Sequence, residues 1–371
     1  MSTSRVALIF LGIQVEPEVA KQSRCWNYFL RTLSIMSMVS MIILSGYNLL
    51  VRDTVLMNVI TLLEFYALKL AVYAMMIRAR DIFPLLTDAV STLNKDAVKK
   101  IRDYDRLHTL IKVAYLMICG GLVAGYLVVN GIGRETTALM LGLVTQSDSD
   151  RVITMICNAL FVIETTVFVH EVQFYISALY VASQLADHAR YRLSSAGLAV
   201  TPDYDAIRKL LEEFNRMMQT INSELGIIPF CLLGMEFVFF SGGISFLVTS
   251  GGSKLAVTPL FAFLTVGTII LLYLFCIYQV IELSTRIRDS MTQAWQMAEE
   301  FAADPLATVT TKESVRRRKA LKFLLVTQSV VPAKACNNIV IDRYLVLKFF
   351  NQLIPFTVMM FTTMQQMDKK A

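Results

Sequence analysis

Long apolar stretches follow one another along the whole chain and constrain its fold more than any other feature. Each is at least 18 residues long, close to the ~20 apolar residues that an α-helix needs to cross a bilayer. Hydrophobic residues make up 55% of the sequence and charged residues 17%, too little charge to cover the surface of a soluble globule. We therefore expect an integral membrane protein, an all-α, seven-transmembrane helical bundle. The expected spans are residues 33–50, 54–77, 108–130, 152–182, 225–250, 257–283 and 344–364.

Basic residues are distributed unevenly among the connections between these spans. Most lysines and arginines fall in the N-terminal segment and in the connections after the second, fourth and sixth spans, including the basic run 316–319. Cytoplasmic segments are enriched in Lys and Arg, so we predict a cytoplasmic N-terminus and an outside C-terminus. The whole chain, residues 1–371, is expected to form one transmembrane domain.

The connections on the predicted cytoplasmic side are long and have a helical pattern. In residues 204–224 apolar side chains recur at i, i+3, i+4 and i+7, and Pro202 and Asp203 provide a helix start. With no breaker before Pro229, this helix is expected to run on into the fifth span. The sixth span is expected to continue as a helix to Asp304 and Pro305, so that such helices reach ~60–70 Å. Their cytoplasmic apolar stripes must bury within the chain or against neighbouring subunits. The stripe of residues 204–224 comprises Ile207, Leu210, Leu211, Phe214, Met217, Met218 and Ile221.

Two carboxylates, Glu64 and Glu164, fall near the middle of the membrane in the second and fourth spans. Charged groups at this depth usually face a cavity or pair with a neighbour. Nearby aromatic and amide side chains would suit a small polar and aromatic ligand pocket. The alternative is that buried carboxylates and hydroxyls hold the helices together, and both interpretations stay open. The candidate ligand-binding residues are Glu64, Phe65, Tyr66, Asn158, Phe161 and Glu164.

The last span closes on two adjacent amides, Gln365 and Gln366. An amide in hydrocarbon needs water or a partner, and a water-filled pore lined by several copies of this helix would provide both. The alternative is an interfacial helix end where the glutamines meet lipid headgroups. The candidate pore-lining residues are Gln366, Gln365, Thr362 and Met359.

Enzyme chemistry is not indicated by any motif. The sequence lacks Walker A, HExxH, GxSxG and paired-carboxylate patterns, and its six cysteines lack metal-ligand spacing. We therefore expect no catalytic residues, no metal site, no cofactor and no nucleic-acid partner. The triplet Asp342-Arg343-Tyr344 precedes the seventh span, whereas in G-protein-coupled receptors such a triplet follows the third, so it carries no functional argument.

Residues 317–366 resemble the C-terminal part of the arthropod chemosensory receptors, which comprise gustatory and odorant receptors. The shared features are a basic helix start, the connector VVPAKACNNIVIDRYLVLKFF and a last apolar helix. Length, number of spans and long cytoplasmic helices extend the resemblance over nearly the whole chain. Gustatory members typically end with Thr-Tyr, five hydrophobic residues, Gln and an aromatic residue. Here Gln366 fits the glutamine position while Met359 and Met360 replace Thr-Tyr, and the terminal glutamine favours a gustatory over an odorant receptor.

The resemblance implies a ligand-gated cation channel, a homo- or heterotetramer in the plasma membrane of chemosensory neurons. In this family the seventh helices line the pore, the cytoplasmic helices anchor the subunits, and each subunit binds a small-molecule tastant or odorant in its outer half. By residue, the resemblance assigns the pore position to Gln366, with Gln365 as the register alternative. A secondary transporter would require inverted repeats, which the two halves do not show. A G-protein-coupled receptor would require the opposite orientation.

Overall fold

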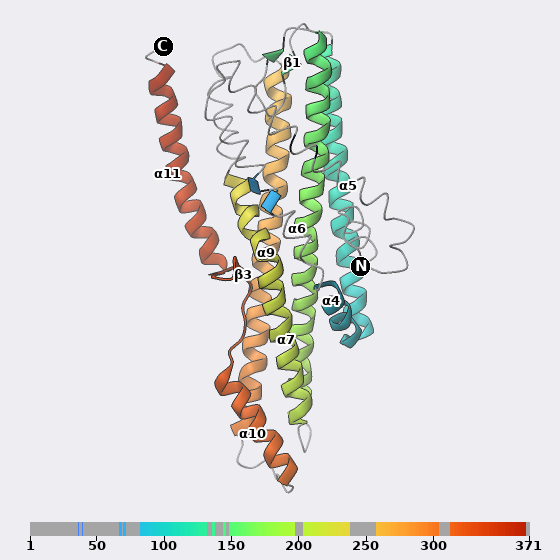
Figure 1. Ribbon diagram of the computed structural model, residues 1–371, viewed down its shortest axis with the longest axis vertical. Helices are drawn as coiled ribbons and strands as arrows, with labels where there is room; N and C mark the ends of the chain where they lie inside the picture. Colours follow the sequence, from blue (N-terminus) through green and yellow to red (C-terminus); the bar gives the residue numbers. More distant parts are fainter. Residues whose placement is uncertain are drawn as a thin grey trace.

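The computed structural model describes most of the chain from residue 82 onward (Figure 1). The described residues are 82–131, 136–137, 144–145, 148–196, 203–237, 257–303 and 312–368, together with Met36, Val39, Ala67, Leu68, Leu70 and Ala71. Most of the first two predicted spans, and residues 238–250 of the fifth, lie outside this description. The number of spans and their orientation therefore stay predictions.

The described chain is mostly helical, which confirms the expected all-α fold. The described residues also contain two antiparallel pairs of two-residue strands: β1 (Thr136–Thr137) pairs with β2 (Val144–Thr145), and β3 (Lys334–Ala335) pairs with β4 (Ile339–Val340). The helices are α4 (Ile82–Thr92), α5 (Lys95–Gly131), α6 (Asp148–Ala196), α7 (Tyr204–Leu225), an unlabelled helix Ile227–Phe237, α9 (Val257–Ala303), α10 (Lys312–Thr327) and α11 (Arg343–Asp368).

The centre of the fold is the long interface between α6 and α9, against which α5 and α7 pack (Figure 1). Helix α9 has 47 residues, which at 1.5 Å per residue is ~70 Å, about twice the hydrocarbon thickness of a bilayer. The described helix reaches Ala303, so the sixth span continues as a helix well beyond residue 283, as the sequence predicts. Among the described helices, the stretch Gly267–Ala303 is the one that is long and apolar enough to cross a membrane.

Helix α7 confirms the amphipathic pattern of residues 204–224. Asp203 caps its N-terminus, since the Asp203 carboxylate accepts a hydrogen bond from the Ala206 amide at 3.1 Å. Its apolar stripe is buried within the chain, apart from the partly buried Leu210, against α6 and α10. The same stripe therefore does not form a contact between subunits.

The predicted continuous helix through to Pro229 is wrong, because α7 ends at Leu225 and a new helix starts at Ile227. The break falls at Gly226, whose carbonyl accepts a hydrogen bond from the Cys336 amide at 2.8 Å. A Cβ atom at this position would lie 3.2 Å from the Lys334 carbonyl oxygen and 2.2 Å from that of Asn222. A residue with a side chain would therefore clash with the Asn222 carbonyl of α7 itself and press on the Lys334 carbonyl of the chain that crosses here. That crossing was not visible in the local sequence pattern.

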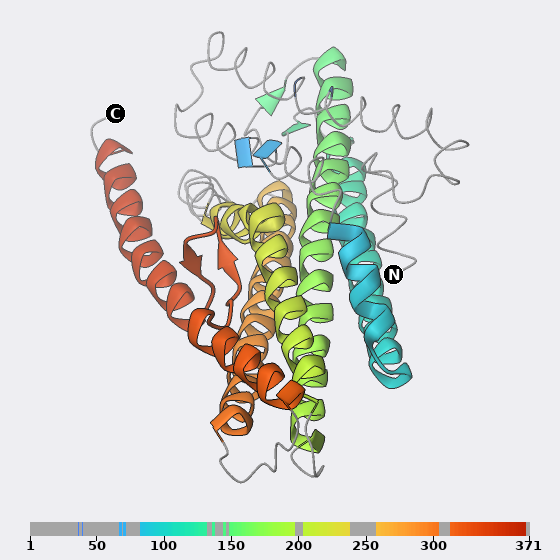
Figure 2. The same ribbon diagram turned by 60° about the horizontal axis from the view of Figure 1, so that its bottom comes forward.

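Helix α11 stands apart from the rest of the described bundle. Figures 1 and 2 show α11 leaning away from α6 and α9, with the β3–β4 hairpin at its base. Of the α11 side chains that the structure describes, Leu353 is the one that is buried. Helix α10, by contrast, packs on α7 and α9 through Leu321, Leu324 and Leu325.

Candidate ligand site and pore helix

The base of α11, the candidate pore helix, is fixed by the first two residues of the Asp-Arg-Tyr triplet. The Asp342 carboxylate accepts a hydrogen bond from the Leu345 amide at 2.9 Å and so caps the helix. The Arg343 guanidinium lies 3.8 Å from the Glu282 carboxylate of α9, and both groups are exposed. Asp342 and Arg343 thus have a structural role at the start of this helix.

The four candidate pore residues lie in the second half of α11. Met359, Thr362 and Gln366 follow each other at i, i+3 and i+7 and share one face of the helix, whereas Gln365 is turned by 100° from Gln366. Met359 and Thr362 are exposed, and the Thr362 hydroxyl donates to the carbonyls of Val358 at 3.0 Å and Met359 at 2.9 Å. The side chains of Gln365 and Gln366 lie outside the description. Helix geometry therefore groups Gln366 with the other two candidates.

Half of the predicted ligand pocket lies outside the described residues: Glu64, Phe65 and Tyr66. Asn158, Phe161 and Glu164 lie on α6, although their side chains are not described. Phe168, one turn beyond Glu164 and two turns beyond Phe161, is buried and meets Tyr273 of α9 edge-on, with ring centroids 5.7 Å apart. The α6 face that carries Phe161 and Glu164 therefore runs on into the α6–α9 interface.

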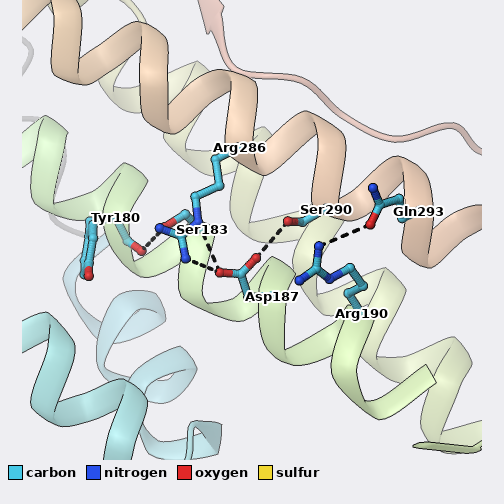
Figure 3. Close-up of polar contacts among 7 residues, drawn as sticks. All are labelled: Tyr180, Ser183, Asp187, Arg190, Arg286, Ser290 and Gln293. Carbon is cyan, nitrogen blue, oxygen red and sulfur yellow. Dashed lines mark hydrogen bonds and ion pairs between the residues drawn. The ribbon is translucent and has the colours of Figure 1, made fainter. Parts of the chain in front are cut away.

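A group of charged and polar side chains joins α6 to α9 farther along both helices (Figure 3); we call it the α6–α9 polar layer. Asp187 is at its centre: one carboxylate oxygen accepts from Arg286, with Nε at 3.1 Å, and the other accepts from the Ser290 hydroxyl at 2.7 Å. One turn on, the Arg190 guanidinium donates to the Gln293 amide oxygen at 3.2 Å. These contacts join the two long helices at this level.

In the sequence, Arg190 and Arg286 were counted only among the basic residues of the connections after the fourth and sixth spans, and the α6–α9 polar layer was not predicted. The sequence signal that could have identified it is the spacing of polar residues after each apolar stretch ends. Asp187 and Arg190 lie about one helical turn apart, and Arg286, Ser290 and Gln293 follow one another at about one turn. The pairing itself joins residues about a hundred positions apart, which helical periodicity does not predict.

An aromatic cluster adds α5 to the same interface. The Tyr104 ring of α5 stacks on Tyr180 of α6, with centroids 3.9 Å apart, and its hydroxyl donates to the Gln279 amide oxygen of α9 at 2.9 Å. The His108 ring lies 4.3 Å from Tyr104 and 5.8 Å from Phe275. Burial, and then the neighbouring Tyr180 and Cys276, raise the pKa of Tyr104 above its usual value. The hydroxyl therefore stays protonated and remains a donor at physiological pH.

Removing this hydroxyl is expected to weaken the joint between α5 and α9. Tyr104→Phe keeps the stack on Tyr180 but loses the hydrogen bond to Gln279, at an expected cost of about 1 kcal/mol. A double-mutant cycle with Gln279→Leu, read by thermal unfolding of the detergent-purified protein, should give a coupling energy of similar size, because both single changes remove the same bond. Strictly additive effects would show that the hydroxyl and the amide do not interact.

The described chain combines three features: helices that extend well beyond a bilayer, a strand hairpin, and a terminal helix that leans away from the bundle. This combination is found in a known fold. The chain has the fold of the insect olfactory receptors. The olfactory receptor OR5 of Machilis hrabei in complex with eugenol matches with a TM-score of 0.68 over 97% of each chain, at 12% sequence identity. A second structure of the same olfactory receptor matches with a TM-score of 0.63 over 96% of each chain, at 10% identity. No protein-family model and no curated protein matches the sequence.

This likeness shows that the chain shares its fold with the insect olfactory receptor OR5. It does not separate gustatory from odorant receptors. The similar structures are receptors, not enzymes. At 10–12% identity the likeness establishes the shared fold, and function has to be argued from the residues of this chain.

Proposed function

We propose that the chain is a subunit of a ligand-gated cation channel that detects small organic molecules at the plasma membrane of chemosensory cells. The observation that carries this proposal is the match in fold to an insect olfactory receptor over 97% of both chains. The match extends from the helical bundle to the terminal helix, and it therefore supports a shared architecture for the proposed channel.

Exposed apolar faces support a membrane location. On α5 one side of the helix is formed by large apolar residues that no described part of the chain covers, and on α9 exposed apolar residues recur every seven positions. Such faces are stable against lipid but costly in water. These residues are Leu107, Leu110, Val113, Met117 and Ile118 on α5, and Leu264, Leu271 and Tyr278 on α9.

A further exposed apolar face, on α10, supports assembly. Phe323 and Val326 are 70% and 78% exposed, although the predicted topology places α10 in the cytoplasm, away from lipid. Apolar side chains of this size in water favour contact with a partner. We propose that this face contacts neighbouring subunits of the tetramer, while the opposite face of α10 packs on α7 and α9.

Truncating the α10 face is expected to weaken assembly without unfolding the subunit. Phe323→Ala with Val326→Ala should raise the dissociation constant of the oligomer by roughly tenfold or more, since central aromatic contacts carry much of an interface's binding energy. Mass photometry of the purified protein would measure the shift from tetramer to smaller species. Leu271→Ala, which truncates an exposed residue on the proposed lipid face of α9, is the matched control. An unchanged oligomer distribution in the double variant would contradict the interface.

The proposed mechanism is a population shift. A ligand held among the second, third, fourth and sixth predicted spans stabilises an arrangement in which the four α11 helices open the pore. To change the open population usefully, it must bind the open state more tightly than the closed state by a few kcal/mol, since a shift from 1:99 to 99:1 needs about 5.5 kcal/mol. The long, packed helices α5, α6 and α9 would transmit the change along the bundle.

The terminal glutamine favours a gustatory receptor, and the alternative is an odorant receptor, whose fold the chain shares. Sugars and bitter compounds are the test ligands for the first. Volatiles, including the eugenol held by the similar receptor, are the test ligands for the second.

Whole-cell recording in a heterologous line, with the chain expressed alone and with candidate partner subunits, tests the proposal. G-protein signalling would be blocked from inside the cell while the ligand panel is applied. A fast cation current that survives the block supports the channel, and the active compound separates taste from odour. A response that disappears under the block would overturn the proposal in favour of a metabotropic receptor.

A further inference from the structure

The segment that joins α10 to α11 lies across α7 and is held there along its length. Residues 328–334, which we call the strap, run from the end of α10 to the first residue of β3 and have no helical structure of their own. A backbone of this kind must find hydrogen-bond partners elsewhere. In this chain the partners come from α7, more than a hundred residues earlier.

Two asparagines of α7, Asn215 and Asn222, provide these hydrogen bonds. They lie seven residues apart, two helical turns, so they occupy the same face, and they are only 3% and 5% exposed. The Asn222 side-chain nitrogen donates to the Pro332 carbonyl, and its side-chain oxygen accepts from the Lys334 amide, both at 2.9 Å. Both ends of the side-chain amide therefore bind the strap.

Asn215 repeats the arrangement at the start of the strap with longer contacts. Its amide nitrogen donates to the Ser329 carbonyl and to the Gln328 side-chain oxygen, both at 3.3 Å, and its oxygen accepts from the Val331 amide at 3.4 Å. Asparagine is an unusual choice for a buried helix face, where apolar residues pack more favourably. Its presence at both positions is explained by the backbone of the strap.

The hydrogen bonds continue without interruption from the strap to the base of α11. The Cys336 amide donates to the Gly226 carbonyl at 2.8 Å, and the Ile341 amide donates to the Ala333 carbonyl at 3.0 Å. Between them the hairpin turns through Cys336 and Asn337, both with left-handed backbone at φ 49° and 63°. The next residue after Ile341 is Asp342, which caps α11. The base of α11 is thus tied to α7, while most of its described length is exposed.

We propose that Asn215 and Asn222 couple the pore helix α11 to the rest of the bundle. They bind the strap so that the base of α11 moves with α7, and displacements of the bundle reach α11 by this route. The inference rests on the proposed channel function for its consequence, although the coupling between strap and α11 can be measured without any current. If the asparagines had a purely local role, they would only provide hydrogen-bond partners for the strap backbone, and their loss would not affect α11.

Hydrogen–deuterium exchange of the purified full-length protein tests the coupling. Asn222→Leu is expected to speed exchange at Lys334 by roughly tenfold, the equivalent of one lost hydrogen bond, and also to speed exchange in the first turns of α11, around residues 345–349. Asn215→Leu is expected to act in the same way at Val331. Gln219→Leu, the same amide-to-leucine change at an exposed position of α7, is the matched control and should change neither region.

Two results would overturn the inference. Faster exchange at Lys334 with unchanged exchange in α11 would show that the strap is bound locally and does not hold the pore helix. Equal effects of Asn222→Leu and Gln219→Leu would show that the asparagines do not hold the strap. Amides of the α6–α9 core, around Leu185, report general destabilisation and should stay constant. A wild-type chain that gives no ligand-gated current would count against the channel and not against this coupling.

Discussion

Channels assembled from Gln366→Leu subunits are expected to lose most of their ligand-evoked cation current. In the proposed tetramer, four amides at this position face permeating ions, and each polar contact is worth about 1 kcal/mol. Four leucines would remove these contacts and favour a dewetted constriction. Because each 1.36 kcal/mol is a factor of ten in rate, the loss of four such contacts is expected to lower the current by roughly three orders of magnitude. Single-channel conductance, measured alongside surface expression, separates lost permeation from lost protein.

Gln365→Leu is the matched control for this experiment and also tests the helix register. Gln365 is turned by 100° from Gln366 on the helix, so its replacement should leave the conductance close to wild type. A loss of conductance in Gln365→Leu alone would move the pore face to the alternative register. Wild-type conductance and gating in both variants would show that α11 does not line the pore with its terminal glutamines.

The amphipathic helix α7 was predictable because its information is local. Apolar residues repeat at helical spacing, Asp203 stands where a cap is needed, and the structure shows the cap and the buried stripe. The continuation of α9 beyond residue 283 was predictable for the same reason. Periodicity and breakers are properties of neighbouring residues, and a helix is formed by contacts between neighbours.

The contacts that join the helices were not predictable in this way. Asp187 pairs with Arg286 across 99 positions, and Asn222 binds the strap across 110. Nothing in the pattern around Asn222 shows that its partner is a backbone carbonyl near the end of the chain. The helix break at Gly226 lies against the same distant segment, since the Gly226 carbonyl accepts a hydrogen bond from the Cys336 amide.

The same difference between local and long-range information separates the candidate pore residues from the candidate ligand pocket. The sequence places Gln366, Thr362 and Met359 on one helix, and α11 brings them to one face. The pocket depends on how the second and fourth spans meet, with Glu64 outside the described residues and Glu164 described only through its backbone. The choice between a ligand pocket and a structural contact therefore stays a proposal, which the ligand panel and substitutions at these two carboxylates would test.

Truncating Phe214 of α7 is expected to give the largest loss of stability of any single change considered for this chain. Phe214 is fully buried in the core, and α7 packs on α6 and α10. The predicted topology places this region in the cytoplasm, where the hydrophobic effect stabilises packing, whereas between helices inside a bilayer that driving force is absent. Phe214→Ala should therefore cost about 3–5 kcal/mol, which is a large part of the ~5–15 kcal/mol of a typical domain.

The measurement is thermal unfolding of the detergent-purified protein, with the monodisperse fraction on size exclusion as a second reading. Tyr191→Ala on α6 removes an aromatic ring of similar size from an exposed position, and it should change stability by less than about 0.5 kcal/mol. The contrast between the two variants isolates burial from loss of an aromatic residue. Equal unfolding temperatures in the two variants would contradict the packing of α7. They would also contradict the role of α7 in holding the strap and, through it, the pore helix.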